Sequence, residues 1–314
     1  MLHSDKEIDQ IIWDAIADSD IQSDFICYVV HSLNEAAHLA EARERIKISR
    51  PMAPAMHYLK AVMMIRNKAE EGDPCAAFHM GKIYSLGIGV MRDVDHGIKW
   101  YEKAMALGEA RAFANMGWFY QEGTGVIKNA EKAFELLSYA GNDGVQSAKT
   151  ASGMMLLKGE GCPKNVELGL SWIEAAFYAG YLNAGNYLSD LYFEGKFVPK
   201  DVVKSHEWLQ KVAEAGDERT MAILGYRLIA GTHGMQDIDA GMAWMQKAID
   251  LKCHQAFLWF ASLYRKGLGV SQDTGKMIQL LEQGIAAGST DCERALEQIF
   301  QEQGIMNQMS KTVQ

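Results

Sequence analysis

The sequence offers few residues whose types and spacing could perform catalysis. It contains no Gly-x-Ser-x-Gly motif and no serine three residues before a lysine, the two local arrangements that activate a serine nucleophile. Its 9 histidines are scattered, without a His-Glu-x-x-His motif or a pair at metal-ligand spacing. One of them, His206, falls in a core-facing position. We therefore expect no catalytic residue, no metal ligand set and no cofactor.

Gly-x-Gly turns such as the one at Gly87 and Gly89 have a composition that also occurs in nucleotide-binding loops. A dinucleotide loop follows a β-strand, whereas Ala76, Met80 and Ile83 precede this turn at the spacing of an amphipathic helix. Glycine is also the residue that most readily adopts the left-handed conformation found at helix C-termini. The turns therefore indicate helix ends. Without a catalytic motif, we expect the chain to act by binding through its surface side chains.

The elements that position those side chains repeat every 36 residues. Trp172, Trp208 and Trp244 are 36 residues apart, and Trp100 lies two periods before Trp172. One unbroken column consists of glycine: Gly87, Gly123, Gly159, Gly195, Gly231 and Gly267. A second contains only side chains that cap helix N-termini: Asp93, Asn129, Asn165, Asp201, Asp237 and Asp273. Self-similarity at this period predicts stacked supersecondary units, and six copies span residues 73–288.

Each copy is predicted to form two helices. In the first copy, Gly87 ends the first helix, Asp93 caps the second, and Gly108 ends it. A glycine inside the first helix is unfavourable by about 1 kcal/mol relative to alanine, so its recurrence predicts that the second helix approaches closely. This column contains Gly81, Gly117, Gly153 and Gly225. We expect the tryptophan column to fill the space between neighbouring units.

These columns closely resemble the Sel-one-like repeat, a relative of the tetratricopeptide repeat. The first copy reads AAFHMGKIYSLGIGVMRDVDHGIKWYEKAMALG and the last reads AFLWFASLYRKGLGVSQDTGKMIQLLEQGIAAG. The six copies span residues 73–288, so the resemblance covers roughly two thirds of the chain. It implies an all-α fold, a right-handed α/α superhelix in which antiparallel helix pairs form a solenoid. It further implies a protein that holds other proteins, often as an adaptor, and it implies no catalytic residue.

The repeats divide the chain into four predicted parts. Residues 1–72 form a helical N-terminal cap, with helices near 8–16, 25–46 and 57–70, the last belonging to a degenerate half-repeat that ends at Gly72. The six repeats occupy residues 73–108, 109–144, 145–180, 181–216, 217–252 and 253–288. Residues 289–304 supply a closing helix, and residues 305–314 form a frayed tail. Terminal elements of this kind are required to cover the last apolar face of a solenoid.

Composition narrows the class of partner. The net charge is −9 and no basic block occurs, which argues against a nucleic-acid surface. The N-terminus lacks the apolar core of a secretory signal, and no stretch approaches the roughly 18 apolar residues that cross a bilayer. The 5 cysteines are odd in number and hold no common place in the repeat. We therefore expect a cytoplasmic protein that binds another protein, without nucleic acid and without membrane insertion.

The resemblance places one face of each first helix on the inner curve of the superhelix. The inward columns would lie six and three residues before the helix glycine, and one and four residues after it. The residue types in these columns differ from copy to copy. Recognition of an asymmetric partner requires such variation. The predicted contact residues are Phe78, Lys82, Arg111, Trp118, Gln121, Met154, Asn186, Asp190, Phe193, Arg219, Tyr226, Gln255 and Arg265. Trp118 and Tyr226 are the sharpest candidates, because large aromatic residues dominate interface hot spots; the alternative is that Trp118 packs within the core.

We therefore predict a non-catalytic scaffold or adaptor that binds a protein segment, a peptide or a helix, in the concave groove. An alternative is a dedicated inhibitor, such as a cytosolic immunity protein that plugs a toxin-like domain. A third possibility is an enzyme or small-molecule binder that uses a cleft between the N-terminal cap and the solenoid. The sequence pattern does not predict an oligomeric state.

Overall fold

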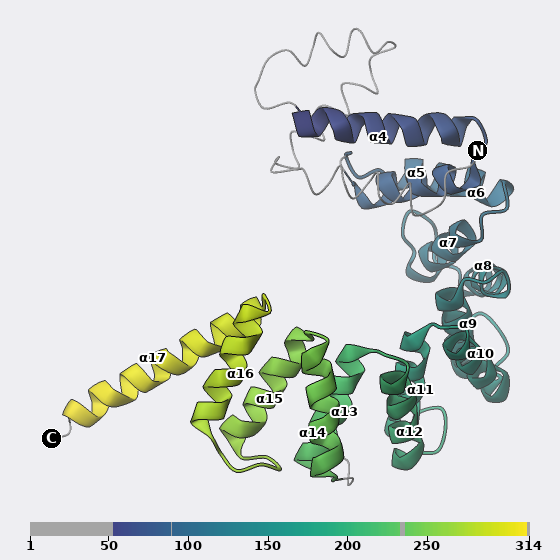
Figure 1. The fold of residues 1–314 in the computed structure, drawn as a ribbon. Coiled ribbons are helices and arrows are strands. Elements are labelled where there is room, and N and C mark those ends of the chain that lie inside the picture. The colour runs from purple at the N-terminus through teal and green to yellow at the C-terminus, as the bar shows by residue number, and fades with distance from the viewer. Residues whose placement is uncertain (1–52, 89, 233–235, 313–314) are drawn as a thin grey trace. The chain divides into compact units, whose positions relative to one another are not determined.

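The chain is all-α in the computed structural model, which describes residues 53–88, 90–232 and 236–312 (Figure 1). These ranges contain fourteen α-helices and no β-strand, which confirms the predicted fold class. The predicted cap helices near residues 8–16 and 25–46 lie outside the described residues. The helices are α4 (Ala53–Glu70), α5 (Pro74–Leu86), α6 (Val94–Ala106), α7 (Ala110–Glu122), α8 (Ala130–Asn142), α9 (Gln146–Lys158), α10 (Val166–Tyr178), α11 (Leu182–Glu194), α12 (Val202–Glu214), α13 (Glu218–Ala230), α14 (Ile238–Asp250), α15 (His254–Lys266), α16 (Thr274–Ala286) and α17 (Thr290–Thr312).

The helices form two compact units, a first unit that ends at Trp172 and a second unit that begins at Ile173. Helices α5 to α16 are each 13 residues long. They are the six predicted helix pairs, and the odd-numbered helix comes first in each. In the first unit α5 packs on α6 and α7 on α8; in the second, α11 packs on α12, α13 on α14 and α15 on α16. Within each unit the second helix of a pair also packs on the next first helix, as α6 does on α7 and α12 on α13.

The turn inside each pair is built by the two unbroken columns. All six glycines of the first column have positive φ, between 65° and 79°, so they end the first helices in the left-handed conformation as predicted. The second column caps the second helices, because each Asp or Asn side chain accepts a hydrogen bond from the backbone N–H three residues later, at 2.9–3.0 Å. The backbone N–H of the same residue donates to a carbonyl of the first helix, as Asp93 does to Tyr84 at 2.8 Å.

The glycines inside the first helices lie where the paired helices cross. A Cβ atom on Gly81 would lie 2.5 Å from the Tyr101 ring, and one on Gly117 would lie 2.6 Å from the Leu137 side chain. In the fifth repeat a Cβ on Gly225 would lie 2.9 Å from the carbonyl oxygen of Gly241. The predicted close approach of the second helix is therefore confirmed, and it explains why a poor helix former recurs at this position.

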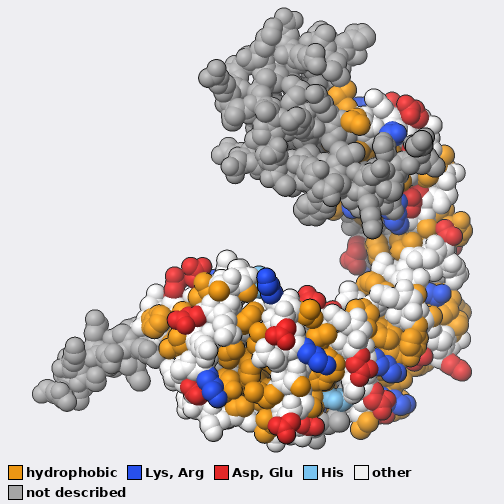
Figure 2. All heavy atoms as spheres, viewed as in Figure 1, with side chains coloured by type: hydrophobic (Ala, Val, Ile, Leu, Met, Phe, Trp, Pro, Cys, Tyr) orange, Lys and Arg blue, Asp and Glu red, His pale blue; other side chains and the backbone are white. Residues whose placement is uncertain are grey.

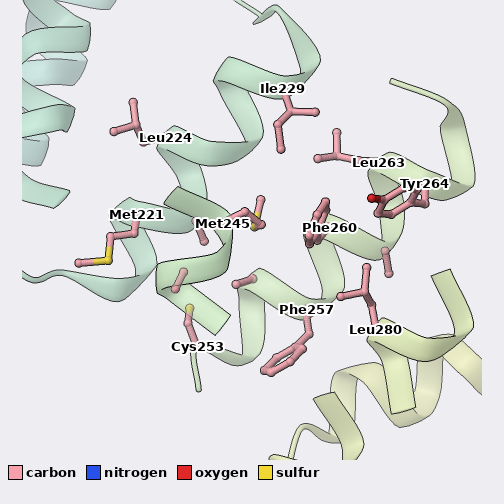
Figure 3. Close-up of a cluster of buried hydrophobic side chains, with 14 of the residues drawn as sticks. Met221, Leu224, Ile229, Met245, Cys253, Phe257, Phe260, Leu263, Tyr264 and Leu280 are labelled. Atoms are coloured by element: carbon pink, nitrogen blue, oxygen red, sulfur yellow. The ribbon is translucent and has the colours of Figure 1, made fainter. Parts of the chain in front are cut away.

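The tryptophan column packs between neighbouring second helices. Trp208 of α12 is 6% exposed, and its ring lies 5.4 Å from that of Phe177 in α10, edge to face. In the first unit, the rings of Trp172 and Phe134 are stacked at 6.5 Å. Figure 3 shows the buried cluster of the second unit to which Leu224, Met245 and Phe260 belong. Within each unit, stacking of the repeats thus produces a core that continues between neighbouring helix pairs.

The two ends of the described chain are closed by single helices. At the N-terminal end, α4 buries Val62, Ile65 and Ala69 and then turns at Gly72, whose φ of 98° matches that of Gly108 at 83°. At the C-terminal end, Cys292 and Ile299 of α17 join the core of the second unit. Helix α17 continues to Thr312, beyond the predicted closing helix 289–304 and into residues that were expected to form a frayed tail.

Candidate functional site

The accessible face of the first helices is rotated relative to the predicted one. Position four after the helix glycine packs on the second helix of the same repeat: a Cβ on Gly241 would lie 2.7 Å from the Ile229 side chain, which is fully buried. Except at His79, which is buried, the accessible columns instead lie six and two residues before the glycine, and one and five after it, at helical spacing. We call these columns the accessible stripe. In the second unit it comprises Asn183, Tyr187, Asp190, Glu194, Arg219, Ile223, Tyr226, Ala230, Gln255, Trp259, Ser262 and Lys266.

In the first unit, three of the predicted contact residues gather around one ring. Phe78 is 7% exposed, and the guanidinium carbon of Arg111 lies 4.5 Å from its ring centre. Lys82 approaches the same ring to 5.9 Å. Arg111 also donates two hydrogen bonds to the Glu109 carboxylate, both at 2.8 Å. Phe78 is therefore covered by cations of its own chain, and little of its ring is available to a partner.

The other predicted residues of the first unit are half-buried. Trp118 lies in the accessible stripe but also packs against the buried cluster that contains Leu137 and Met155. Gln121 and Met154 have intermediate exposure. The structure therefore gives Trp118 both a core contact and an accessible edge.

In the second unit, Asn186 links two neighbouring repeats, because its side-chain oxygen accepts a hydrogen bond from the Thr220 hydroxyl at 3.1 Å. The Phe193 ring is half-buried and has the Lys200 ammonium 4.9 Å from its centre. Three further predicted residues lie on or near the surface: Arg219 and Arg265, which are exposed, and Gln255, which is half-buried.

A pocket of about 440 Å³ opens on the accessible stripe between α13 and α15. Tyr226 is the predicted contact residue that lines it, and its ring lies 6.3 Å from that of Trp259, inclined by 57°. The described residues that line the pocket are Ile223, Tyr226, Arg227, Thr232, Trp259, Ser262 and Lys266. Trp259 was missed because the column two residues before the helix glycine was not taken as inward; its spacing of three residues from Ser262 could have indicated it.

Arg227 is the unusual member of this lining. The equivalent residues in the other repeats are all apolar: Ile83, Phe119, Met155, Leu191 and Leu263. Arg227 is half-buried, and burial lowers the pKa of its guanidinium while Asp190 acts in the opposite direction. Its guanidinium carbon lies 5.9 Å from the Phe193 ring centre. Within the described ranges, no hydrogen bond or ion pair engages this guanidinium.

Two further titratable groups interact with Arg227. Burial raises the pKa of Asp190 on α11, and Arg227 lowers it. Burial lowers the pKa of His206 on α12, and the positive charge of Arg227 lowers it further. His206 is half-buried in a column that is otherwise apolar, as its equivalents Ile98 and Met242 show. Polar residues thus replace apolar ones in two columns of adjacent repeats.

The surrounding surface is of mixed charge. On the face shown in Figure 2, acidic and basic side chains alternate, and hydrophobic side chains emerge between them over α13 to α16. None of the helices in the described ranges combines the length and the apolar character needed to cross a membrane.

Comparison with known proteins supports the repeat assignment. A family model described as Sel1 repeat matches residues 76–109, 110–145, 147–181, 183–217, 219–253 and 254–289, which confirms the six predicted repeats. A solved Sel1 repeat protein from Oxalobacter formigenes is 26% identical with a TM-score of 0.59, and the match covers 75% of this chain and 97% of that one. A protective antigen present in uropathogenic Escherichia coli strains, which displays an SLR fold, is 27% identical with a TM-score of 0.56.

Two of these relatives are longer than the region that this chain matches. The match covers 78% of this chain and 52% of the Escherichia coli antigen. Among curated proteins, the DAP3-binding cell death enhancer 1 of Rattus norvegicus is 33% identical over 85 residues. That match covers 26% of this chain and 17% of the rat protein.

Proposed function

The chain belongs to the Sel1 repeat family, and from that premise we propose that it is a non-catalytic scaffold that binds a segment of another protein on the accessible stripe of its second unit. The observation that carries the proposal is the pair of rings, Tyr226 and Trp259, at the pocket between α13 and α15. The rat relative is named for binding a protein, DAP3, which agrees with a role in protein interaction.

The aromatic pair has the properties of an interface anchor. Both rings are half-buried, so their positions are held by the first helices before a partner arrives. Aromatic side chains bury a large area at low entropic cost and are enriched among the residues that dominate binding energy. Neither residue recurs in the equivalent position of all repeats, so the pair distinguishes this place on the solenoid from the others.

Other accessible residues extend the proposed surface. In the second unit they are Asp190, Arg219, Gln255 and Arg265; Lys82, Trp118, Gln121 and Met154 belong to the first unit and form a separate proposed surface there. We assign them a weaker role at the rim, where polar contacts set register more than affinity. We also propose a cytoplasmic location, which the free thiols of Cys162, Cys253 and Cys292 support.

The proposal is tested by comparing partner capture from the native host by three immobilised forms of the chain. These are the wild type, the double variant Tyr226→Ala/Trp259→Ala, and Tyr139→Ala, which removes a ring that is 51% exposed on a second helix. We expect the double variant to lose the specifically captured protein and Tyr139→Ala to retain it. Equal capture by all three forms would refute the proposed surface.

The same capture separates an adaptor from a dedicated inhibitor. An adaptor is expected to retain several partners with modest affinity, whereas an inhibitor of one toxin-like domain is expected to retain a single partner at nanomolar affinity. We propose the adaptor, and a single partner retained at nanomolar affinity would favour the inhibitor instead.

A further inference from the structure

We infer that the pocket between α13 and α15 accepts a large apolar side chain that is flanked by a carboxylate in the partner, and that Arg227 binds this carboxylate. The inference rests on the proposed function and specifies the class of partner as an acidic protein segment that carries an apolar anchor. It assigns a role to Arg227, which the repeat pattern does not explain.

The pocket itself is suited to an apolar group. Its volume of about 440 Å³ falls within the roughly 300–1,000 Å³ of ligand pockets. Ile223, Tyr226 and Trp259 supply its apolar walls, while the hydroxyls of Thr232 and Ser262 are the neutral polar groups among its described residues. An aromatic or branched aliphatic side chain can therefore contact rings on both neighbouring first helices.

Arg227 supplies the charge that selects the partner. A guanidinium has five N–H donors, and a half-buried one gains most from a carboxylate, which can accept two of them side by side. The structure provides stacking on Phe193 and a longer-range attraction to Asp190, but no hydrogen bond or ion pair within the described ranges. A leucine, which occupies the equivalent positions as Leu191 and Leu263, would complete the packing of the repeat without this unpaired charge.

The charge of the pocket opposes that of the chain. The protein has 40 acidic and 31 basic residues, yet the described lining of the pocket contains two cations, Arg227 and Lys266, and no carboxylate. Lys266 also lies in the last turn of α15, where a cation is favoured by the helix dipole alone. Arg227 lies in the last turn of α13 and gains from the same dipole, but, unlike Lys266, it occupies a column that is otherwise apolar.

These features favour an acidic segment over a neutral one. A neutral apolar segment that filled the pocket would remove water from the Arg227 guanidinium without offering an acceptor, which is unfavourable. A segment that carries Asp or Glu beside its apolar residue supplies both the apolar contact and the acceptor. We expect the carboxylate to improve binding about tenfold or more, the effect of one charge-assisted hydrogen-bonded pair.

The test uses three fluorescein-labelled peptides of twelve residues on a Gly/Ser framework. Their central residues are Glu-Phe-Asp, the uncharged Gln-Phe-Asn, and Glu-Ser-Asp, which lacks the apolar anchor. Fluorescence anisotropy measures their affinity for the wild type, for Arg227→Leu, and for Arg294→Leu as a control that removes an exposed cation of α17, outside the proposed surface. Inorganic phosphate is added as a competitor to reveal general anion binding.

We expect the wild type and Arg294→Leu to prefer the Glu-Phe-Asp peptide over both others by about tenfold. Arg227→Leu should bind the charged and uncharged phenylalanine peptides equally, with its helical circular dichroism unchanged. The inference is overturned if the wild type binds none of the peptides or shows no preference, if Arg227→Leu keeps the preference, or if millimolar phosphate abolishes the preference for the charged peptide.

The inference and the proposed function fail in different ways. If Tyr226→Ala/Trp259→Ala loses the native partner while Arg227→Leu retains it at full affinity, the scaffold proposal stands and the acidic-segment inference is wrong. If the double variant retains the native partner, the proposed surface itself is wrong, whatever the peptides show.

Discussion

The ammonium nitrogen of Lys204 lies 5.2 Å from the ring centre of Tyr192, so that the first turn of α12 contacts the last turn of α11. Equivalent pairs occur in three other repeats: Lys132 over Tyr120, Lys276 over Tyr264, and His96 stacked on Tyr84. The two remaining repeats have Leu156 and Leu228 in place of the ring, and Leu168 and Ala240 in place of the cation. The basic side chain and the ring therefore vary together across the repeats, which indicates that they stabilise the turn as a pair.

A double-mutant cycle on Lys204→Ala and Tyr192→Leu measures this pair. We expect a coupling free energy of about 0.5–1 kcal/mol, the size of an exposed cation–π contact. The measurement is urea unfolding followed by circular dichroism for the four proteins of the cycle. A coupling energy indistinguishable from zero would mean that the two side chains are merely adjacent.

Trp208→Ala is expected to damage the fold. Its side chain is 6% exposed and contacts Phe177, so the change leaves a cavity between neighbouring repeats and should cost about 3–5 kcal/mol. The matched change Tyr139→Ala, at a ring that is 51% exposed and lies 4.2 Å from the Phe113 ring, should cost only about 1 kcal/mol. Chemical unfolding of the two variants checks both values, and similar losses from both would contradict the assigned packing role.

Lys252 occupies a position that the other repeats give to glycine. Its φ is 60°, and it is the only non-glycine residue with positive φ in the described part of the chain. We expect Lys252→Gly to raise stability by roughly 0.5–1 kcal/mol, because glycine adopts this conformation without steric cost. Lys252→Ala removes the same side chain and keeps the strain, so it should not stabilise. Thermal melting of both variants tests this expectation, and an equal gain from both would assign the effect to the lysine charge.

His206 should make the stability of the second unit depend on pH. Burial and Arg227 lower its pKa in the folded state, whereas Glu207 raises it. The unfolded chain therefore binds the proton more readily, so stability is complete above the ordinary pKa of about 6.5 and declines as the pH falls below it. The pKa of Asp190 is also raised in the folded state, from 3.8, and its titration affects stability at a lower pH than that of His206.

His206→Met places at this position the residue found at the equivalent Met242. We expect the variant to lose less stability than the wild type between pH 7.5 and pH 5.5. Urea midpoints at the two pH values provide the measurement. A larger loss in the variant would show that the folded state favours the protonated imidazole.

The sequence predicted the repeating part of the fold because that part depends on the backbone. A left-handed turn at Gly87 and a capped helix at Asp93 each require a particular kind of residue, so every copy carries the same signal. The crossing at Gly81 was predictable for the same reason, because a Cβ atom has no room there. Helix α17 was longer than predicted, since its last residues carry no comparable column.

The candidate site was predictable only in part, because the direction of a side chain depends on how each helix is rotated against its partner. Tyr226 lines the pocket, but Phe78 was expected at the surface and lies beneath Arg111. Trp259 and Arg227 were missed, since one lies in a column not assigned to the inner face and the other in a column that is otherwise core. A rotation of one residue along a helix, about 100°, is enough to exchange these positions.

The most direct test of the proposed surface is photo-crosslinking in the native host. Tyr226 is replaced with the photo-reactive amino acid benzoylphenylalanine in one form of the chain, and Tyr139 is replaced in another. We predict that irradiation links the partner protein to the chain substituted at Tyr226, beside the pocket between α13 and α15. Crosslinks to the partner from Tyr139 and none from Tyr226 would contradict it.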